Sequence, residues 1–110
     1  MSDRIDAFLK MLESGKDSAL LRFSLGNEYL ARDEPAAAAT HLEEAVRQDS
    51  GYSAAWKLLG KAREAAGDAD GAIAAWRDGI ASAEAAGDRQ AAKEMTVFIK
   101  RAEKRKGSGR

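Results

Sequence analysis

The sequence contains no cysteine, one proline and one histidine among its 110 residues. Without cysteine, a disulfide framework, a thiolate metal site and a cysteine nucleophile are all excluded. Aromatic residues make up 6 % of the chain and β-branched residues are sparse, which argues against a β-sheet. No apolar run approaches the roughly 20 residues that a membrane-spanning helix needs, and the amino-terminal segment lacks the pattern of a secretion signal. We therefore expect a cytoplasmic protein without membrane contact.

The charges balance, with 18 Lys and Arg against 18 Asp and Glu. A neutral molecule has no overall attraction to nucleic acid or to a membrane surface. Good helix formers (Ala, Leu, Glu, Lys and Arg) dominate the composition. A chain of this length is one domain's worth. The composition thus predicts a single all-α domain.

Apolar periodicity and helix-end residues predict six helices with short connections. Gly15 and Gly67 follow expected helix ends, and Pro35 stands in an expected first turn. We interpret the aspartates at helix starts as caps: Asp17, Asp33, Asp68 and Asp88. The expected helices span residues 2–14, 18–32, 35–48, 53–66, 70–85 and 88–105, and residues 107–110 form a flexible tail.

A unit of 34 residues recurs in the middle of the chain. Gly26 matches Gly60 at this offset, as Leu25 matches Leu59 and Ala38 matches Ala72. Glycine inside a helix costs about 1 kcal/mol relative to alanine, so it needs a compensating reason. We interpret the paired glycines and alanines as places where neighbouring helices approach closely.

These positions resemble the tetratricopeptide repeat, whose pattern is W-x2-L-G-x2-Y followed by A-x3-F and P. The matching residues are Leu25, Gly26, Tyr29, Ala38 and Leu42 in one unit, and Trp56, Leu59, Gly60, Ala72 and Trp76 in the other. The units cover residues 19–52 and 53–86. The resemblance implies a right-handed α-solenoid of two helix hairpins, within one domain of residues 1–106.

The two units depart from the pattern in ways that carry their own expectations. Arg63 replaces the usual tyrosine, and Trp76 stands where the first unit has Leu42. We interpret this as an exchange of volume, with the stem of Arg63 on the packed surface and its head in water. The terminal proline is absent, so the fifth helix is expected to run longer than usual.

A stack of hairpins exposes an apolar face at each end, and the flanking helices are expected to cover them. The covering residues are Ile5, Phe8, Leu9 and Leu12 in front and Ala91, Met95, Phe98 and Ala102 behind. In an alternative interpretation, Met95, Phe98 and Ile99 pair with a second chain and make a homo-oligomer.

The resemblance also implies a concave groove, lined by the first helix of each hairpin, that receives a protein or peptide. The partner-binding candidates are Phe23, Asn27, Leu30, Lys57, Lys61 and Glu64, with Leu20 at a further groove position. We expect the partner to offer an apolar side chain and a nearby acidic group. For Phe23 and Leu30 a place in the core is the competing interpretation.

No other motif predicts chemistry. There is no nucleophile–base pair and no phosphate-cradling loop, so we expect no catalytic residue, no cofactor and no metal site. His41 is interpreted as a solvated side chain. Residues 100–106 are mostly basic, and we interpret them as cations that stabilise the carboxyl end of a helix. A weaker alternative function is that of a nucleic-acid accessory protein that binds through this segment.

Overall fold

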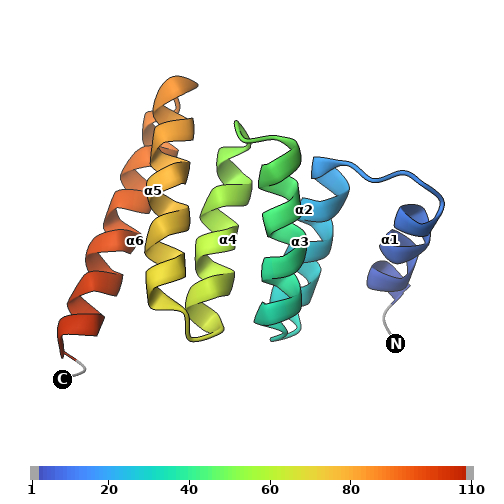
Figure 1. Cartoon of the computed structure of the whole chain (residues 1–110), viewed down its shortest axis with the longest axis horizontal. Coiled ribbons are helices and arrows are strands. Elements are labelled where there is room, and N and C mark those ends of the chain that lie inside the picture. The colour runs from blue at the N-terminus through green and yellow to red at the C-terminus, as the bar shows by residue number, and fades with distance from the viewer. Residues whose placement is uncertain (1–2, 109–110) are drawn as a thin grey trace.

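The computed structural model describes residues 3–108 and contains six α-helices stacked in chain order (Figure 1). They are α1 (Asp3–Glu13), α2 (Ala19–Ala31), α3 (Pro35–Gln48), α4 (Ser53–Ala65), α5 (Ala69–Ala85) and α6 (Arg89–Ser108). The all-α prediction is confirmed. The fifth helix has 17 residues and α3 has 14, although the terminal proline is absent from both units. Residues 107–108 were predicted as tail but continue α6; residues 2, 109 and 110 lie outside the described part.

A residue with positive φ reverses the chain after α1, α2, α4 and α5. Glycines serve at three of these turns, with φ near +88° at Gly15 and Gly67 and +76° at Gly87. Asp33 serves at the fourth with φ 59°, a conformation that aspartate tolerates better than most side chains. Asp33 is therefore a turn residue and not the helix cap that the sequence suggested.

Side-chain caps begin three of the helices. Asp68 accepts a hydrogen bond from the Gly71 amide at 2.8 Å, and Asp88 accepts one from the Ala91 amide at 3.1 Å, as predicted. Helix α2 is capped by Ser18, whose hydroxyl oxygen accepts from the Leu21 amide at 3.1 Å. Asp17 is consequently free of the capping role assigned to it and instead binds a side chain of α2.

Each hairpin is closed by a large side chain that occupies the space where a glycine lacks its Cβ. A Cβ on Gly26 would lie 2.4 Å from Leu42, and one on Gly60 would lie 2.1 Å from the ring nitrogen of Trp76. The Trp76 ring nitrogen donates a hydrogen bond to the Lys57 carbonyl at 3.1 Å. At both positions the glycine thus admits a large side chain of the neighbouring helix.

The guanidinium of Arg63 is held by two neighbouring helices. Its guanidinium donates a hydrogen bond to the Gly71 carbonyl at 3.1 Å and forms an ion pair with Glu43 at 3.2 Å. The expected exchange of volume with Trp76 places Arg63 on the packed surface, but its head is engaged with α3 and α5 and not left to water. Arg63 therefore links three consecutive helices.

The flanking helices cover the two ends of the stack. Ile5 of α1 is buried against Leu21 and Leu25 of α2. Met95 of α6 is fully buried where a Cβ on Gly79 would lie 2.5 Å from its sulfur. Both contacts were predicted as end caps, and the glycine that receives Met95 repeats the arrangement inside the two hairpins.

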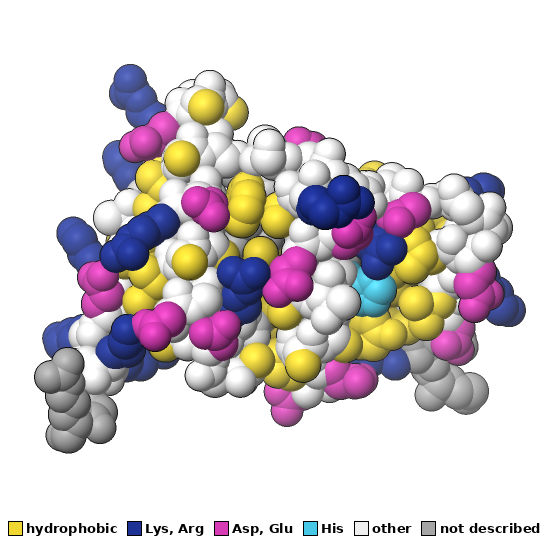
Figure 2. Space-filling model, viewed as in Figure 1, with side chains coloured by type: hydrophobic (Ala, Val, Ile, Leu, Met, Phe, Trp, Pro, Cys, Tyr) yellow, Lys and Arg dark blue, Asp and Glu magenta, His cyan; other side chains and the backbone are white. Residues whose placement is uncertain are grey.

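The helices form two layers. In Figure 1, α3 and α5 lie in front while α2 and α6 lie partly behind them, and the molecule measures 44 × 33 × 18 Å. The same face in space-filling form mixes apolar side chains with charges of both signs (Figure 2). Among residues 3–108, no helix combines the length and apolarity that crossing a bilayer would require.

The Gly60–Trp76 contact generates a stability prediction. Replacing Gly60 by Ala places a methyl group against the Trp76 ring, and overpacking of this kind costs about 1–3 kcal/mol. We expect urea unfolding to show that loss although alanine is the better helix former. Gly107→Ala is the matched control, because its added methyl meets nothing within 4 Å. Equal stability of the two variants would contradict the contact.

Candidate functional site

The predicted partner-binding residues belong to α2 and α4, and we call the exposed surface around Leu20, Asn27 and Lys61 the first-helix face. Phe23 and Leu30 are half-buried and pack against the core. The ring of Phe23 lies 5.1 Å from that of Tyr52, in the connection before α4. This packing favours the core interpretation of both side chains over the groove interpretation.

The accessible part of the first-helix face on α2 is formed by two other side chains. Leu20 is 66 % exposed, which is far above the other large apolar residues of the helix. Asn27 lies two turns further along and is also exposed. Together they offer an apolar contact and a hydrogen-bonding amide on one side of α2.

The charged candidates on α4 are all engaged by α6. Lys57 pairs with Glu94 at 2.6 Å, and Glu64 pairs with Arg105 at 3.1 Å. The ammonium of Lys61 lies 4.1 Å from the centroid of the Phe98 ring. The hydrogen bond from Lys57 lowers the pKa of the Glu94 carboxyl. These side chains therefore fasten α6 to α4, a role that the sequence interpretation missed.

A signal for the placement of α6 was present at a different spacing. Helix α4 begins at Ser53 and α6 at Arg89, so the two helices are 36 residues apart and not 34. At the 36-residue offset Leu59 matches Met95, and both are fully buried. A search limited to the period of the first two units overlooks this register of α6.

The self-association candidates on α6 face the interior to different degrees. Met95 has no exposed surface, and the Phe98 ring lies 5.4 Å from that of Trp76. Ile99 is half-buried against the same cluster. Met95 is therefore unavailable to a second chain in this fold, which corrects its place in the proposed interface.

His41 belongs to a polar cluster that joins α2 and α3. Its ring stacks on Tyr29, with centroids 5.5 Å apart, and its Nδ1 lies 3.1 Å from an Arg22 nitrogen. The Arg22 guanidinium also donates hydrogen bonds to both carboxylate oxygens of Asp17 at 2.9 Å, which lowers the pKa of that carboxyl. Burial, followed by the charge of Arg22, lowers the pKa of His41. His41 is thus a packed residue and not the solvated side chain expected.

The basic segment of α6 is partly neutralised within the chain. Arg105 pairs with Glu64, and Lys106 pairs with Asp70 at the start of α5. These contacts reduce the charge available to nucleic acid. Within residues 3–108, no group of three His, Asp or Glu side chains is placed to hold a metal ion.

Comparisons with known proteins identify the family. The chain is 53 % identical over 100 residues to TPR repeat-containing protein PA0015 of Pseudomonas aeruginosa, covering 91 % of this chain and 95 % of that protein. The solution structure of protein BPP2914 from Bordetella parapertussis is 41 % identical, with a TM-score of 0.81 over 96 % of this chain and 91 % of that one. No family model matches the sequence.

A tetratricopeptide repeat domain protein from Salinibacter ruber extends the similarity. It is 29 % identical and has a TM-score of 0.72, covering 79 % of this chain and 88 % of its own. The chain belongs to the tetratricopeptide repeat family, as the resemblance predicted.

The contact between α4 and α6 generates a prediction. Lys57→Glu places two carboxylates side by side at Glu94, so we expect a lower urea midpoint. Exchanging the charges in Lys57→Glu/Glu94→Lys restores the attraction and recovers most of the loss. A double variant no more stable than Lys57→Glu alone would show that the pair does not hold α6.

The environment of His41 generates a pH prediction. Because its folded pKa lies below the ordinary 6.5, the unfolded chain takes up the proton first as pH falls. The contribution of neutral His41 to the stability of the fold is full above the ordinary pKa. It declines as the pH falls from that value through the lowered pKa of the folded state. We expect Tm to fall between about pH 7.5 and about pH 5, where histidine titrates.

The matched variant for this titration is His41→Phe, which retains a ring for Tyr29 but carries no proton. Its Tm should vary less over the same interval, as measured by circular dichroism. Identical pH profiles for the two proteins would assign the effect to other groups.

Proposed function

We propose that this protein binds a segment of another protein on the first-helix face. The observation that carries the proposal is Leu20, a leucine 66 % exposed at a position that the family resemblance assigns to the groove. An isolated exposed leucine is ordinary, but this one lies beside half-buried Phe23 and exposed Asn27. Such a combination suits a partner that inserts an apolar side chain and hydrogen-bonds to the amide.

The charges of α4 refine the partner's chemistry. Lys57 and Glu64 already have partners on α6, so a partner's charge would have to displace them. Lys61 is exposed above an aromatic ring and its ammonium can still accept an acidic neighbour. We therefore centre the contact on Leu20 and Asn27 and place an acidic group of the partner toward Lys61.

Photocrosslinking in cells tests this surface. A photoreactive benzoylphenylalanine at Asn27 should yield adducts with a partner protein. The same residue at Ala74, which is exposed on α5, is the matched control and should yield none of them. Adducts of equal yield at both positions would contradict the proposed face.

A second variant connects the adduct to Leu20. Leu20→Ser removes the apolar contact without opening the core, so the adduct at position 27 should decrease several-fold. Met11→Ser, at an exposed methionine of α1, serves as control and should leave it unchanged. An adduct that both substitutions leave intact would exclude Leu20 from the contact.

A further inference from the structure

Helix α6 has the register of a first helix in a third hairpin. At the 36-residue offset from α4, Ala55 matches Ala91 and Leu59 matches Met95, and all four are buried. Met95 packs at Gly79 of α5, and Leu59 shares a core cluster with Ala45 of α3. Each helix thus rests on the second helix of the hairpin before it.

The opposite stripe of α6 lacks the helix that α4 has. In α4 this stripe meets α5, because Gly60 receives Trp76 and Arg63 bonds to the Gly71 carbonyl. The counterparts in α6 are Thr96 and Ile99. Thr96 is exposed, whereas Ile99 is half-buried against the cluster that contains Trp76. Within residues 3–108, α6 contacts α5 and α4 and no other helix.

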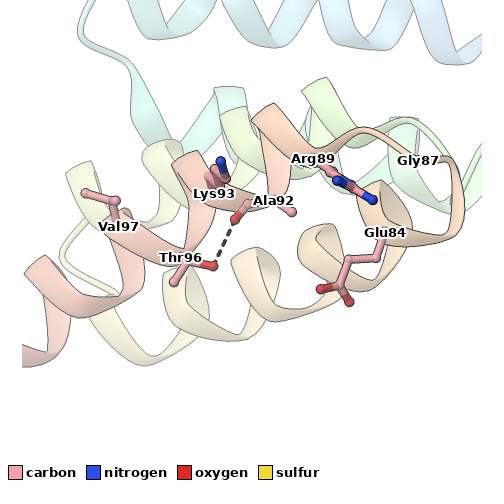
Figure 3. A pocket seen from close by; sticks show the side chains of 7 residues that line it. All are labelled: Glu84, Gly87, Arg89, Ala92, Lys93, Thr96 and Val97. Carbon is pink, nitrogen blue, oxygen red and sulfur yellow. Dashed lines mark hydrogen bonds between the residues drawn. The ribbon is translucent and has the colours of Figure 1, made fainter.

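A cleft of about 720 Å³ opens at this place, which we call the end cleft (Figure 3). Its walls include Arg89, Ala92, Lys93, Thr96 and Val97 of α6 together with Glu84 at the end of α5. Ala92 is half-buried, and Val97 is 42 % exposed. The floor therefore carries small and apolar side chains of the size that a packed helix requires.

Uncompensated positive charge lies along the cleft. Four exposed cations follow this side of α6: Arg89, Lys93, Lys100 and Lys104. Within the described residues none of them takes part in an ion pair, in contrast to Arg105 and Lys106. Glu84 is the one acid among the lining residues. Charge complementarity thus favours an acidic occupant.

We propose that the end cleft binds an acidic amphipathic helix of another protein, which completes a third hairpin with α6. Its apolar stripe would lie on Ala92 and Val97, and its carboxylates would face Lys93 and Lys100. The residue opposite Thr96 must be small, because threonine fills the space that Gly60 leaves for a tryptophan ring. A second copy of α6 is a poor occupant, since it would place lysines against lysines.

Titration of the isotope-labelled full chain with two synthetic helices tests the proposal by NMR. Both peptides carry an Ala/Leu stripe over roughly 20 residues, long enough to form a helix; one has Glu on its flanks and the other Lys. The Glu peptide should shift the amide signals of residues 89–100. The Lys peptide should bind at least about tenfold more weakly, because it meets like charges.

Two threonine variants provide the matched comparison. Thr96 and Thr40 are both exposed, and each hydroxyl donates to the carbonyl four residues earlier. Thr96→Trp fills the cleft and should weaken the Glu peptide by about tenfold or more, whereas Thr40→Trp on α3 should leave it unchanged. Lys93→Glu/Lys100→Glu should also abolish binding, and thermal melts verify that each variant folds.

Four results of the peptide titrations would overturn the proposal. They are no binding of the Glu peptide, shifts confined to Leu20 and Asn27, equal binding by the two threonine variants, and equal binding of the two peptides. Changes in α6 signals with protein concentration alone would assign the cleft to a second copy, and shifts with single-stranded DNA but not the peptide would assign it to nucleic acid. The photocrosslinks at Asn27 test the first-helix face and not the end cleft. Failure of one proposal would therefore leave the other unaffected.

Discussion

The fold depends on side chains that occupy the missing Cβ space of a glycine on the neighbouring helix. Leu42 fills it at Gly26, Trp76 at Gly60 and Met95 at Gly79. In each case a methyl group at the receiving glycine would lie 2.5 Å or less from the incoming side chain. Protein interiors are packed as densely as organic crystals, so this fit fixes how far the two helices can slide. The spacing and register of the stack follow from it.

The same contact explains which residues reach the surface of the first helices. Because Trp76 lies across Gly60 and bonds to the Lys57 carbonyl, α4 is held with Lys57 and Lys61 turned toward α6. Met95 then positions α6 so that Glu94 and Phe98 meet those lysines. The charges of the first-helix face are therefore organised by apolar packing beneath them.

The helices, the repeat and the end caps could be predicted from the sequence because they depend on local patterns. Gly60 and Leu59 repeat at a fixed offset, and Ile5 belongs to an apolar periodicity. The partners of Lys57 and Arg63 could not be predicted in this way, since they depend on how far apart two helices lie in the folded stack. The assignment of Asp17 and Asp33 as caps was wrong. Aspartate also serves in turns and ion pairs, and its position in the sequence does not distinguish these uses.

Within residues 3–108, the backbone of each helix contacts those of its neighbours along the chain, and α4 also contacts α2 and α6. In an architecture of this kind, most contacts join residues that are close in the sequence. Folding can therefore begin at one hairpin and spread to its neighbours. Its cooperativity then resides in the interfaces between successive units. The terminal helices α1 and α6 each pack against the stack on one face only. We therefore expect local unfolding to begin at these two helices.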